Sequence, residues 1–504
     1  MAGEIREVAN GRAFPLAFAA IMATSFCFIL RALVIDEWGV VFALSETQKG
    51  QLLGAGLWPF AITIVLLSLI VDKVGFRAVF AFAGIAHLVG LALLLSAQGY
   101  VLLYAGTFVM ALGNGAAEAA ANPLIATVYA GDKPRWLNRL HAAWPGGMIA
   151  GGLLAIALGQ FVGWQIKVAL MVLPVLAYTV LLFGARLPVS ERVASGVRFR
   201  AMLQEAGWGS AFIILFLIML EIGRLGDLGM TAILVTTAVL TLAFGLYTRR
   251  AGQPLYILFV LLMLPLAITE LSTDSWISSM MAPEMARLGL QPGWVLIYAS
   301  LIVFLIRIVA GTIIARLTAL GTLMLASFLT AIGLLLLSGE EGFALLFAAT
   351  LYGIGKSFFW GTSLAVVSER FPRAGAVGLN VVAGAGMLGA GIVGSALLGT
   401  VQDRTTVQLL AERDQAQATS LVERYTVARS GNLGGGTYRT IDEGALARAP
   451  AEERKKVEAV RDFSKKDALR GIALLPLLMG LVYAALLFWF RRKGGYKPVV
   501  LTDG

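Results

Sequence analysis

The chain repeats three short patterns of residues at a nearly constant distance along its length. In each case the second copy lies 238 to 242 positions after the first. The repeated residues are Leu33, Asp36 and Trp38 with Leu271, Asp274 and Trp276, Gly113 and Gly115 with Gly353 and Gly355, and Leu137 and Asn138 with Leu379 and Asn380. A near-constant offset in three separate stretches indicates two homologous halves. Two repeated halves with a solute site between them are a common construction of membrane transporters, so the pattern favours transport.

The composition indicates a chain that lies mostly within lipid. Hydrophobic residues make up 58% of it, its mean hydropathy is +0.82, and only 14% of its residues are charged. A soluble domain carries about 25% charged residues. Residues 52–71 contain no charge over a length that crosses a bilayer as a helix, which takes about 20 residues. We therefore expect helices throughout, because backbone polar groups in lipid must be satisfied within each segment.

The hydropathy pattern predicts an all-α, polytopic membrane protein with two pseudo-symmetric six-helix bundles and two inserted central helices. The expected spans are 14–35, 51–71, 78–98, 101–129, 141–162, 166–185, 208–225, 228–247, 254–274, 293–315, 318–338, 343–368, 376–400 and 470–490. The expected domains are 1–186 for the first bundle, 187–252 for a cytoplasmic linker with the inserted pair, and 253–504 for the second bundle.

Basic residues gather in the loops on one side of these spans, and the positive-inside rule places that side and both termini in the cytoplasm. This asymmetry explains the net charge of +10 without a nucleic-acid partner. The first segment has no small-residue cleavage site and is expected to stay as a membrane helix. We expect a multi-pass, monomeric protein of the inner (plasma) membrane.

The residues 402–469 form one long polar stretch on the outer side, with charges of both signs and glycines at 431–436. The pattern predicts two polar helices around a flexible break. A solvated appendage, a lid over the outer mouth and a partner-docking surface are the three interpretations that we consider.

A short motif follows the second span: Ser68, three apolar residues, Asp72, Lys73, one residue, Gly75, then Phe76 and Arg77. It resembles the loop motif of the major facilitator superfamily. The equivalent place in the second half keeps Gly311 and Arg316 but has no aspartate. An aspartate at a helix end can pair with a basic residue or a neighbouring helix N-terminus. We expect Asp72, Lys73, Gly75 and Arg77 to act as a gating latch.

The fourth span contains Glu118, Asn122 and Pro123, and Leu137 and Asn138 follow it. This Glu-x-Ala-Ala-Asn-Pro core with a downstream Leu-Asn resembles the fucose/glucose/galactose–proton symporter family. The resemblance implies a proton-coupling role for Glu118. That family also has a functional aspartate in the first helix, whereas here Arg31 occupies the deeper position and Asp36 lies nearer the outer rim.

A charged carboxylate in the middle of a membrane costs at least ~2.5 kcal/mol on insertion scales. Glu118 therefore either takes up a proton, faces a cavity, or forms a permanent ion pair with Arg31 or Lys356. Glu118 and Asn122 share one helix face because they are four residues apart, and Pro123 leaves a backbone carbonyl without its helical donor.

Further polar and aromatic residues within the spans are candidates for binding the solute. The full predicted set is Arg31, Asp36, Asn122, Asn138, Glu270, Asp274, Arg307, Lys356, Trp360 and Asn380. Arg307 also has a structural interpretation as a partner for Glu270 or Asp274. Trp360 and its neighbours Phe358 and Phe359 also have a structural interpretation, as core or lipid-facing residues. His141 is expected to lie too near the cytoplasmic end to bind solute. Glu221 and Arg224 of the inserted pair are expected to neutralise each other.

The function favoured by these patterns is proton-coupled uptake of a monosaccharide or related small polar solute. Organic-anion or sugar-acid uptake, drug–proton antiport and solute sensing are the alternatives. An enzyme is not expected, because no His or Cys cluster or nucleotide-binding loop is present. With one cysteine, Cys27, and two histidines in the chain, we expect no metal and no cofactor.

Overall fold

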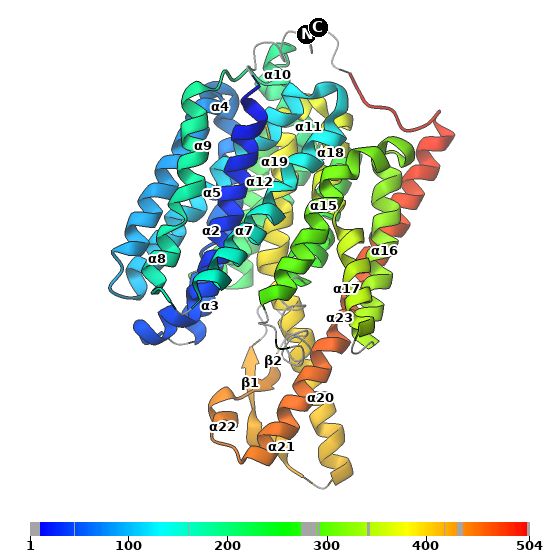
Figure 1. The fold of residues 1–504 in the computed structure, drawn as a ribbon. Helices are drawn as coiled ribbons and strands as arrows, with labels where there is room; N and C mark the ends of the chain where they lie inside the picture. Colours follow the sequence, from blue (N-terminus) through cyan, green and yellow to red (C-terminus); the bar gives the residue numbers. More distant parts are fainter. Residues whose placement is uncertain are drawn as a thin grey trace.

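The computed structural model describes residues 11–44, 46–159, 161–273, 289, 293–339, 343–417, 419–430 and 437–500. Within these ranges the chain is a bundle of long helices with one small β-hairpin (Figure 1). The helices of the first half, coloured blue to cyan, stand beside those of the second half, coloured green to red. The predicted all-α fold of two bundles with an inserted pair is confirmed.

The first half contains five helical stretches that are long and apolar enough to cross a membrane. Its elements are α2 (Ala13–Val41), α3 (Glu46–Gly54), α4 (Trp58–Leu95), α5 (Tyr100–Val128), η1 (Ala130–Asp132), α6 (Lys133–His141), α7 (Ala143–Leu158), α8 (Trp164–Ala169) and α9 (Val172–Gly184). Helix α4 is interrupted at Gly75, whose φ of 82° is one that glycine adopts without strain. It therefore accounts for two of the predicted spans.

Helices α2 and α7 pack at close range because α7 presents glycines to α2. A Cβ atom on Gly147 would lie 2.4 Å from the carbonyl oxygen of Met22 and 3.0 Å from the backbone nitrogen of Phe26. No larger residue fits there without moving a helix backbone. Small residues are the usual means by which membrane helices approach closely.

The linker between the halves contains α10 (Glu191–Ala194), α11 (Phe199–Leu225) and α12 (Met230–Thr248). Helix α11 packs on α12 and on the second half. The outer face of α12 is exposed and apolar, as Leu242 at 63% and Leu246 at 69% show. Arg224 Nε donates to Glu221 Oε2 at 2.9 Å, so the predicted pairing of these two residues is confirmed.

The second half runs from Pro254 to the end of the last helix. Its elements are α13 (Pro254–Ala267), the π-helix η2 (Ile268–Ser272), α15 (Gly293–Leu317), α16 (Ala319–Gly339), α17 (Phe343–Lys356), α18 (Phe359–Arg370), η3 (Pro372–Ala374), α19 (Gly375–Leu388), the π-helix η4 (Gly389–Gly394), α20 (Ser395–Gln417) and α23 (Ala451–Arg492). The predicted span 343–368 is divided between α17 and α18, so neither part is long enough to cross alone.

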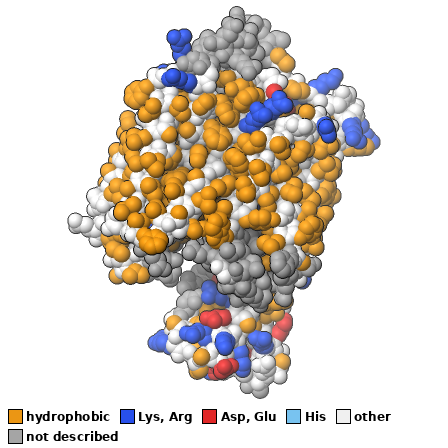
Figure 2. All heavy atoms as spheres, viewed as in Figure 1, with side chains coloured by type: hydrophobic (Ala, Val, Ile, Leu, Met, Phe, Trp, Pro, Cys, Tyr) orange, Lys and Arg blue, Asp and Glu red, His pale blue; other side chains and the backbone are white. Residues whose placement is uncertain are grey.

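Among the described residues, twelve helical stretches are long and apolar enough to cross a membrane. The difference from the fourteen predicted spans arises at the interrupted helix α4 and at the α17–α18 break. Figure 2 shows hydrophobic side chains across the visible face of the bundle, and lysines and arginines near one end of it. Helix α2 begins and α23 ends at that end of the bundle, which we call the terminus end (Figure 1).

A small unit projects from the opposite end, carried by α20 and α23 (Figure 1). It adds α21 (Leu421–Tyr425), α22 (Glu443–Ala447) and an antiparallel hairpin of β1 (Thr426–Ser430) with β2 (Thr437–Ile441). It has its own apolar core, formed by Leu410, Leu421, Tyr425, Ile441, Leu446, Val457 and Val460. The prediction of two polar helices alone was therefore wrong: strands flank the predicted break, which itself lies outside the described residues.

Candidate functional site

A pocket lies between the two halves, near the middle of the bundle. Its lining residues are Glu118, His141, Trp144, Glu270, Leu271, Arg307, Trp360 and Met387. The first half contributes α5, α6 and α7, and the second contributes η2, α15, α18 and α19. The pocket has a volume of about 20 Å³, on the order of a single water molecule. A sugar-sized solute therefore requires the lining side chains to move apart.

Glu118 is buried at 3% exposure and receives hydrogen bonds from both halves. Asn122 Nδ2 and Trp360 Nε1 each donate to Glu118 Oε1 at 3.3 Å. Among the described residues, no cation pairs with this carboxylate. The predicted alternative of a permanent ion pair with Arg31 or Lys356 is thus not what this conformation contains.

Asn122 continues the hydrogen-bonded chain to His141. The distance from His141 Nε2 to Asn122 Oδ1 is 2.9 Å. Because the amide nitrogen of Asn122 donates to Glu118, its oxygen accepts from His141, which therefore carries its proton on Nε2. The prediction that His141 lies too near the end of the bundle was wrong. The span begins at Ala130 rather than at residue 141, so His141 falls well within it.

Arg307 is 2% exposed and connects three elements at the pocket. Its Nε donates to the carbonyl of Ser357 at 3.0 Å and its Nη1 donates to the carbonyl of His141 at 2.9 Å. Its Nη2 forms an ion pair with Glu270. The predicted structural role of Arg307 as a carboxylate partner is therefore confirmed, and the residue also spans the two halves.

Two contacts between the halves use backbone carbonyls that prolines leave free. Pro123 has no N–H, so the carbonyl of Ala119, four residues earlier, has no helical donor; Asn380 Nδ2 donates to it at 2.9 Å. Pro145 frees the carbonyl of His141 in the same way, and this is the carbonyl to which Arg307 donates. In both cases a side chain of the second half satisfies a carbonyl of the first.

The duplicated asparagines both reach across to the other half. Asn380 donates to the carbonyl of Ala119 in the first half, and Asn138 Nδ2 donates to Thr362 Oγ1 in the second half at 3.1 Å. Asn138 also donates to the carbonyl of Pro134 at 2.9 Å. Each repeated asparagine thus donates to the opposite half, Asn380 to a backbone carbonyl and Asn138 to a hydroxyl.

Of the remaining predicted binding residues whose side chains are described, Lys356 and Arg31 are not part of the pocket lining. Lys356 is buried with its ammonium 4.9 Å from the ring centre of Tyr352. Asp36 belongs to α2, but its side chain and the whole of Asp274 lie outside the described residues. Phe358 and Phe359, considered as core or lipid-facing residues, are 6% and 0% exposed and belong to the core.

Arg31 stands apart from the other buried cations. It is 3% exposed, and its Nε and Nη1 atoms have no hydrogen-bond partner among the described residues. The guanidinium lies against Gly56, where a Cβ atom would come within 2.3 Å of Nη2. Phe28, one turn earlier on α2, lies 6.1 Å from the ring of Trp144, which lines the pocket. Arg31 is therefore about one helical turn from the pocket.

The four predicted latch residues lie at the terminus end. Asp72 accepts hydrogen bonds from Arg192 Nε and Ser190 Oγ, each at 2.6 Å, and Arg77 donates to the carbonyl of Leu182 at 2.9 Å. Lys73 lies 5.1 Å from the ring centre of Phe199, and Gly75 forms the turn.

The partner of Asp72 belongs to the short helix α10, which lies between the halves. Next to Arg192, Glu191 pairs with Lys133 at 2.7 Å, and Lys133 Nζ also donates to the carbonyl of Ser368 in the second half at 3.3 Å. The side chain of Arg192 lies beside Gly375. Sequence reasoning missed Arg192 and Glu191, because nothing in their spacing distinguishes them from other linker charges.

We expect the carbonyl freed by Pro123 to make Asn380 important for stability. Asn380→Ala leaves a buried carbonyl unsatisfied, which costs about 1–3 kcal/mol. Pro123→Ala restores a helical N–H, so the double variant should be more stable than the sum of the single effects implies. Thermal unfolding of the four proteins in detergent tests this. Strict additivity would show that the two residues do not act through the same carbonyl.

The family and the fold are established by comparison with known proteins. The model of the Major Facilitator Superfamily matches residues 13–272, slightly more than half of the 504 residues. A comparison with curated protein sequences found no match.

Among solved structures, the proton:xylose symporter XylE bound to 6-bromo-6-deoxy-D-glucose is similar, with a TM-score of 0.63, 14% identity and 96% of each chain covered. A single-residue variant of the fucose:proton symporter FucP of E. coli has a TM-score of 0.54 and 14% identity, covering 93% of this chain and 99% of FucP. An auto-inhibited POT-family peptide transporter has a TM-score of 0.58 and 14% identity, covering 98% of this chain and 100% of that one. At these identities the structures show the fold alone. The family model matches more than half of this chain, and the chain therefore belongs to the Major Facilitator Superfamily.

Proposed function

We propose that this transporter carries a proton together with a monosaccharide or a related small polar solute, by alternating access of the pocket to the two sides of the membrane. The observation that carries the proposal is the position of Glu118. It is a buried carboxylate without a cationic partner among the described residues, and it accepts hydrogen bonds from Asn122 of its own half and Trp360 of the other.

A proton on Glu118 changes the contacts between the halves. The ionised carboxylate accepts hydrogen bonds, and the protonated one is also a donor. Charge-assisted hydrogen bonds are about twice as strong as neutral ones, so protonation weakens the bond from Trp360. Proton uptake then favours a different arrangement of the halves, which is what coupling requires.

The chemistry of the pocket supports a polyhydroxylated solute. Trp144 and Trp360 offer aromatic faces, while Glu118 and His141 offer groups that can bond to hydroxyls. XylE and FucP are described as proton symporters of sugars, which agrees with this proposal. A peptide transporter resembles the chain at a comparable TM-score, so the pocket residues, and not the fold, support the choice of solute.

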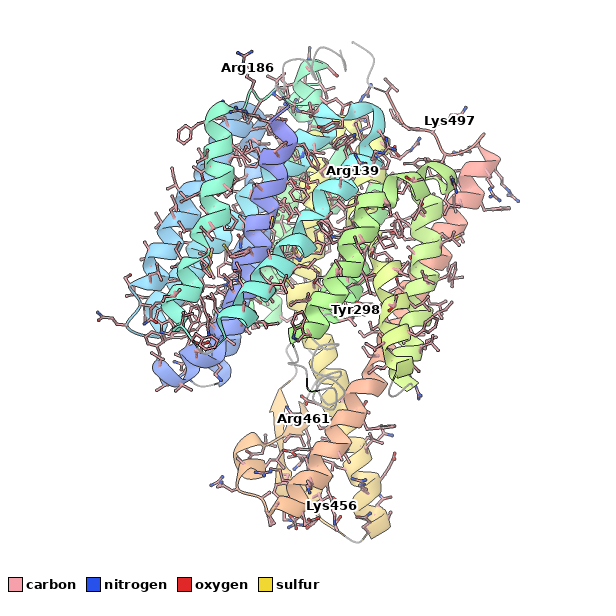
Figure 3. All side chains as sticks on the ribbon, viewed as in Figure 1. Arg139, Arg186, Tyr298, Lys456, Arg461 and Lys497 are labelled. Carbon is pink, nitrogen blue, oxygen red and sulfur yellow. The ribbon has the colours of Figure 1, made fainter. Side chains whose placement is uncertain are left out.

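Charge and geometry together support an orientation. Lysines and arginines gather at the terminus end, such as Arg186 and Lys497, labelled in Figure 3. The positive-inside rule then places that end in the cytoplasm of a cell whose inner membrane holds the protein. Several contacts that join the halves, such as Lys133 with Ser368, lie toward this end. We therefore assign the conformation to a state closed toward the cytoplasm.

Removing the charge of Glu118 is expected to uncouple transport. In Glu118→Gln, uphill accumulation driven by a pH gradient should fall to equilibration, whereas exchange of solute between the two sides should continue, because the amide cannot take up the proton. Glu221→Gln is the matched control, since Glu221 pairs with Arg224 in the inserted helices. Uptake of radiolabelled sugar into proteoliposomes measures both. Undiminished uphill uptake in Glu118→Gln would remove this residue from coupling.

The contact between Asp72 and Arg192 is expected to set the rate of opening. Removing one partner of a buried ion pair costs about 3–5 kcal/mol, and a shift of about 1.4 kcal/mol in a barrier changes a rate tenfold. Asp72→Asn should therefore slow turnover by at least about tenfold while the Kd for solute changes little. Asp132→Asn, at the exposed pair with Arg135, is the control. A large loss of affinity with normal turnover would contradict the latch.

A second candidate, uptake of a sugar acid or other organic anion, is favoured by one observation. The guanidinium of Arg31 is buried one turn from the pocket with two donor atoms unpartnered among the described residues. A solute carboxylate would satisfy these donor atoms.

If the solute is such an anion, glucuronate should exchange faster than glucose, and Arg31→Gln should lower kcat/KM for glucuronate at least about tenfold. If Arg31→Gln transports glucuronate normally, this candidate fails while the sugar proposal stands.

A further inference from the structure

A groove of about 740 Å³ lies at the terminus end, away from the central pocket. The linker and the beginnings of α11 and α13 form one side of it. The end of α18, the segment η3, Trp489 near the end of α23, and the tail residues Val499 and Val500 complete it. Nothing in the transport mechanism proposed above uses this groove.

Three arginines line the groove: Arg198, Arg370 and Arg373. Among the described residues, none of them forms an ion pair. Arg370 Nη1 donates to the carbonyl of Lys497 at 2.5 Å, and its Nε atom is buried without a partner. One carboxylate, Glu205, also lines the groove and accepts from Gln253 Nε2 at 2.8 Å. Three cations against one acid leave the groove with an excess of positive charge.

The C-terminal tail is held in place as a wall of this groove. The backbone nitrogen of Val499 donates to the carbonyl of Glu369 at 2.8 Å, and the hydroxyl of Tyr496 donates to Glu369 Oε2 at 2.7 Å. The ring of Tyr496 also packs on Phe490 at 5.4 Å between centroids. These contacts attach the tail side of the groove to the end of α18 and to α23. Lys497 is labelled on this tail in Figure 3.

Apolar side chains continue from the groove toward the lipid-facing surface. Leu255, Phe371, Trp489 and Val500 share its lining with the arginines. On the last turns of α23, Trp489 is 42% and Phe488 is 57% exposed, and Leu481 further along the helix is 56% exposed. Tryptophan is enriched where membrane helices meet the headgroup layer. A free phosphate ion would use the arginines but gain nothing from the apolar wall.

We propose that this groove binds the phosphate headgroup of an anionic phospholipid, with its acyl chains lying along the exposed apolar face of α23. Arginine binds phosphate oxygens in a bidentate manner, and basic pockets between membrane helices are suited to anionic headgroups. The lipid would fasten the linker and the C-terminal tail to the second half. This inference does not depend on the identity of the transported solute.

Native mass spectrometry of the full-length protein, extracted in mild detergent from membranes containing phosphatidylglycerol, tests the proposal. The natural protein should retain one phosphatidylglycerol molecule. The variant Arg198→Gln with Arg373→Gln should retain it at least tenfold less often. Arg249→Gln with Arg316→Gln, which removes two exposed arginines outside the groove, is the matched control and should behave as the natural protein does. Equal retention in all three proteins would overturn the proposal.

Thermal unfolding separates a lipid from a soluble anion. Short-chain phosphatidylglycerol should raise the Tm of the natural protein and of the control, whereas inorganic phosphate and short-chain phosphatidylcholine should not. The groove variant should not respond to phosphatidylglycerol, and its unchanged Tm without lipid would show that it folds. Equal stabilisation by inorganic phosphate, or by phosphatidylcholine, would overturn the assignment to an anionic lipid.

Discussion

Two backbone carbonyls that prolines leave without helical donors decide how the halves of this transporter meet. An unsatisfied carbonyl in a dry, apolar interior is costly, and lipid offers no water to compensate for it. Pro123 and Pro145 create such carbonyls at Ala119 and His141, both in the first half. Asn380 and Arg307 of the second half donate to them. Directional hydrogen bonds at these two points therefore help to fix the contact between the halves, together with the bonds of Trp360 to Glu118 and of Asn138 to Thr362.

The pocket lies beside these two points, and this gives its polar side chains their arrangement. Arg307 is oriented by the carbonyl of His141 and by Glu270 at the same time. The side chain of that same histidine bonds to Asn122, which bonds to Glu118. A change at the carboxylate is thus connected through two hydrogen bonds to a residue that joins the halves. When the halves separate, Asn380 and Arg307 must exchange carbonyls for water, which is possible only if the pocket is hydrated in that state. This is the physical link that we propose between solute entry, proton uptake and the movement of the halves.

Much of this fold follows from patterns that the sequence displays directly. Hydropathy predicts most of the spans, and the repeat pairs Asn138 with Asn380, each of which donates to the opposite half. Spacing alone put Glu118 and Asn122 on one face, and the free carbonyl behind Pro123 was predictable from backbone chemistry. The hydrogen-bond partners of these groups could not be predicted from the sequence. Trp360 and Arg192 reach their contacts through tertiary packing between distant segments, and no local pattern reports that. The prediction for His141 was wrong because the helix starts eleven residues earlier than hydropathy indicates. The hairpin of the small unit carried by α20 and α23 was not predicted, because short strands beside glycines resemble a polar loop in the sequence.

If Glu118 couples transport, a proton must cross the membrane with the solute, and a recording of the external pH tests this. The pH outside de-energised vesicles that contain the protein is recorded while a panel of monosaccharides is added. Proton symport predicts that at least one neutral sugar makes the outer solution more alkaline, and that a protonophore abolishes the change. A sugar that shows rapid net uptake into the same vesicles while the outer pH stays constant would contradict it, because net transport would then proceed without the proton.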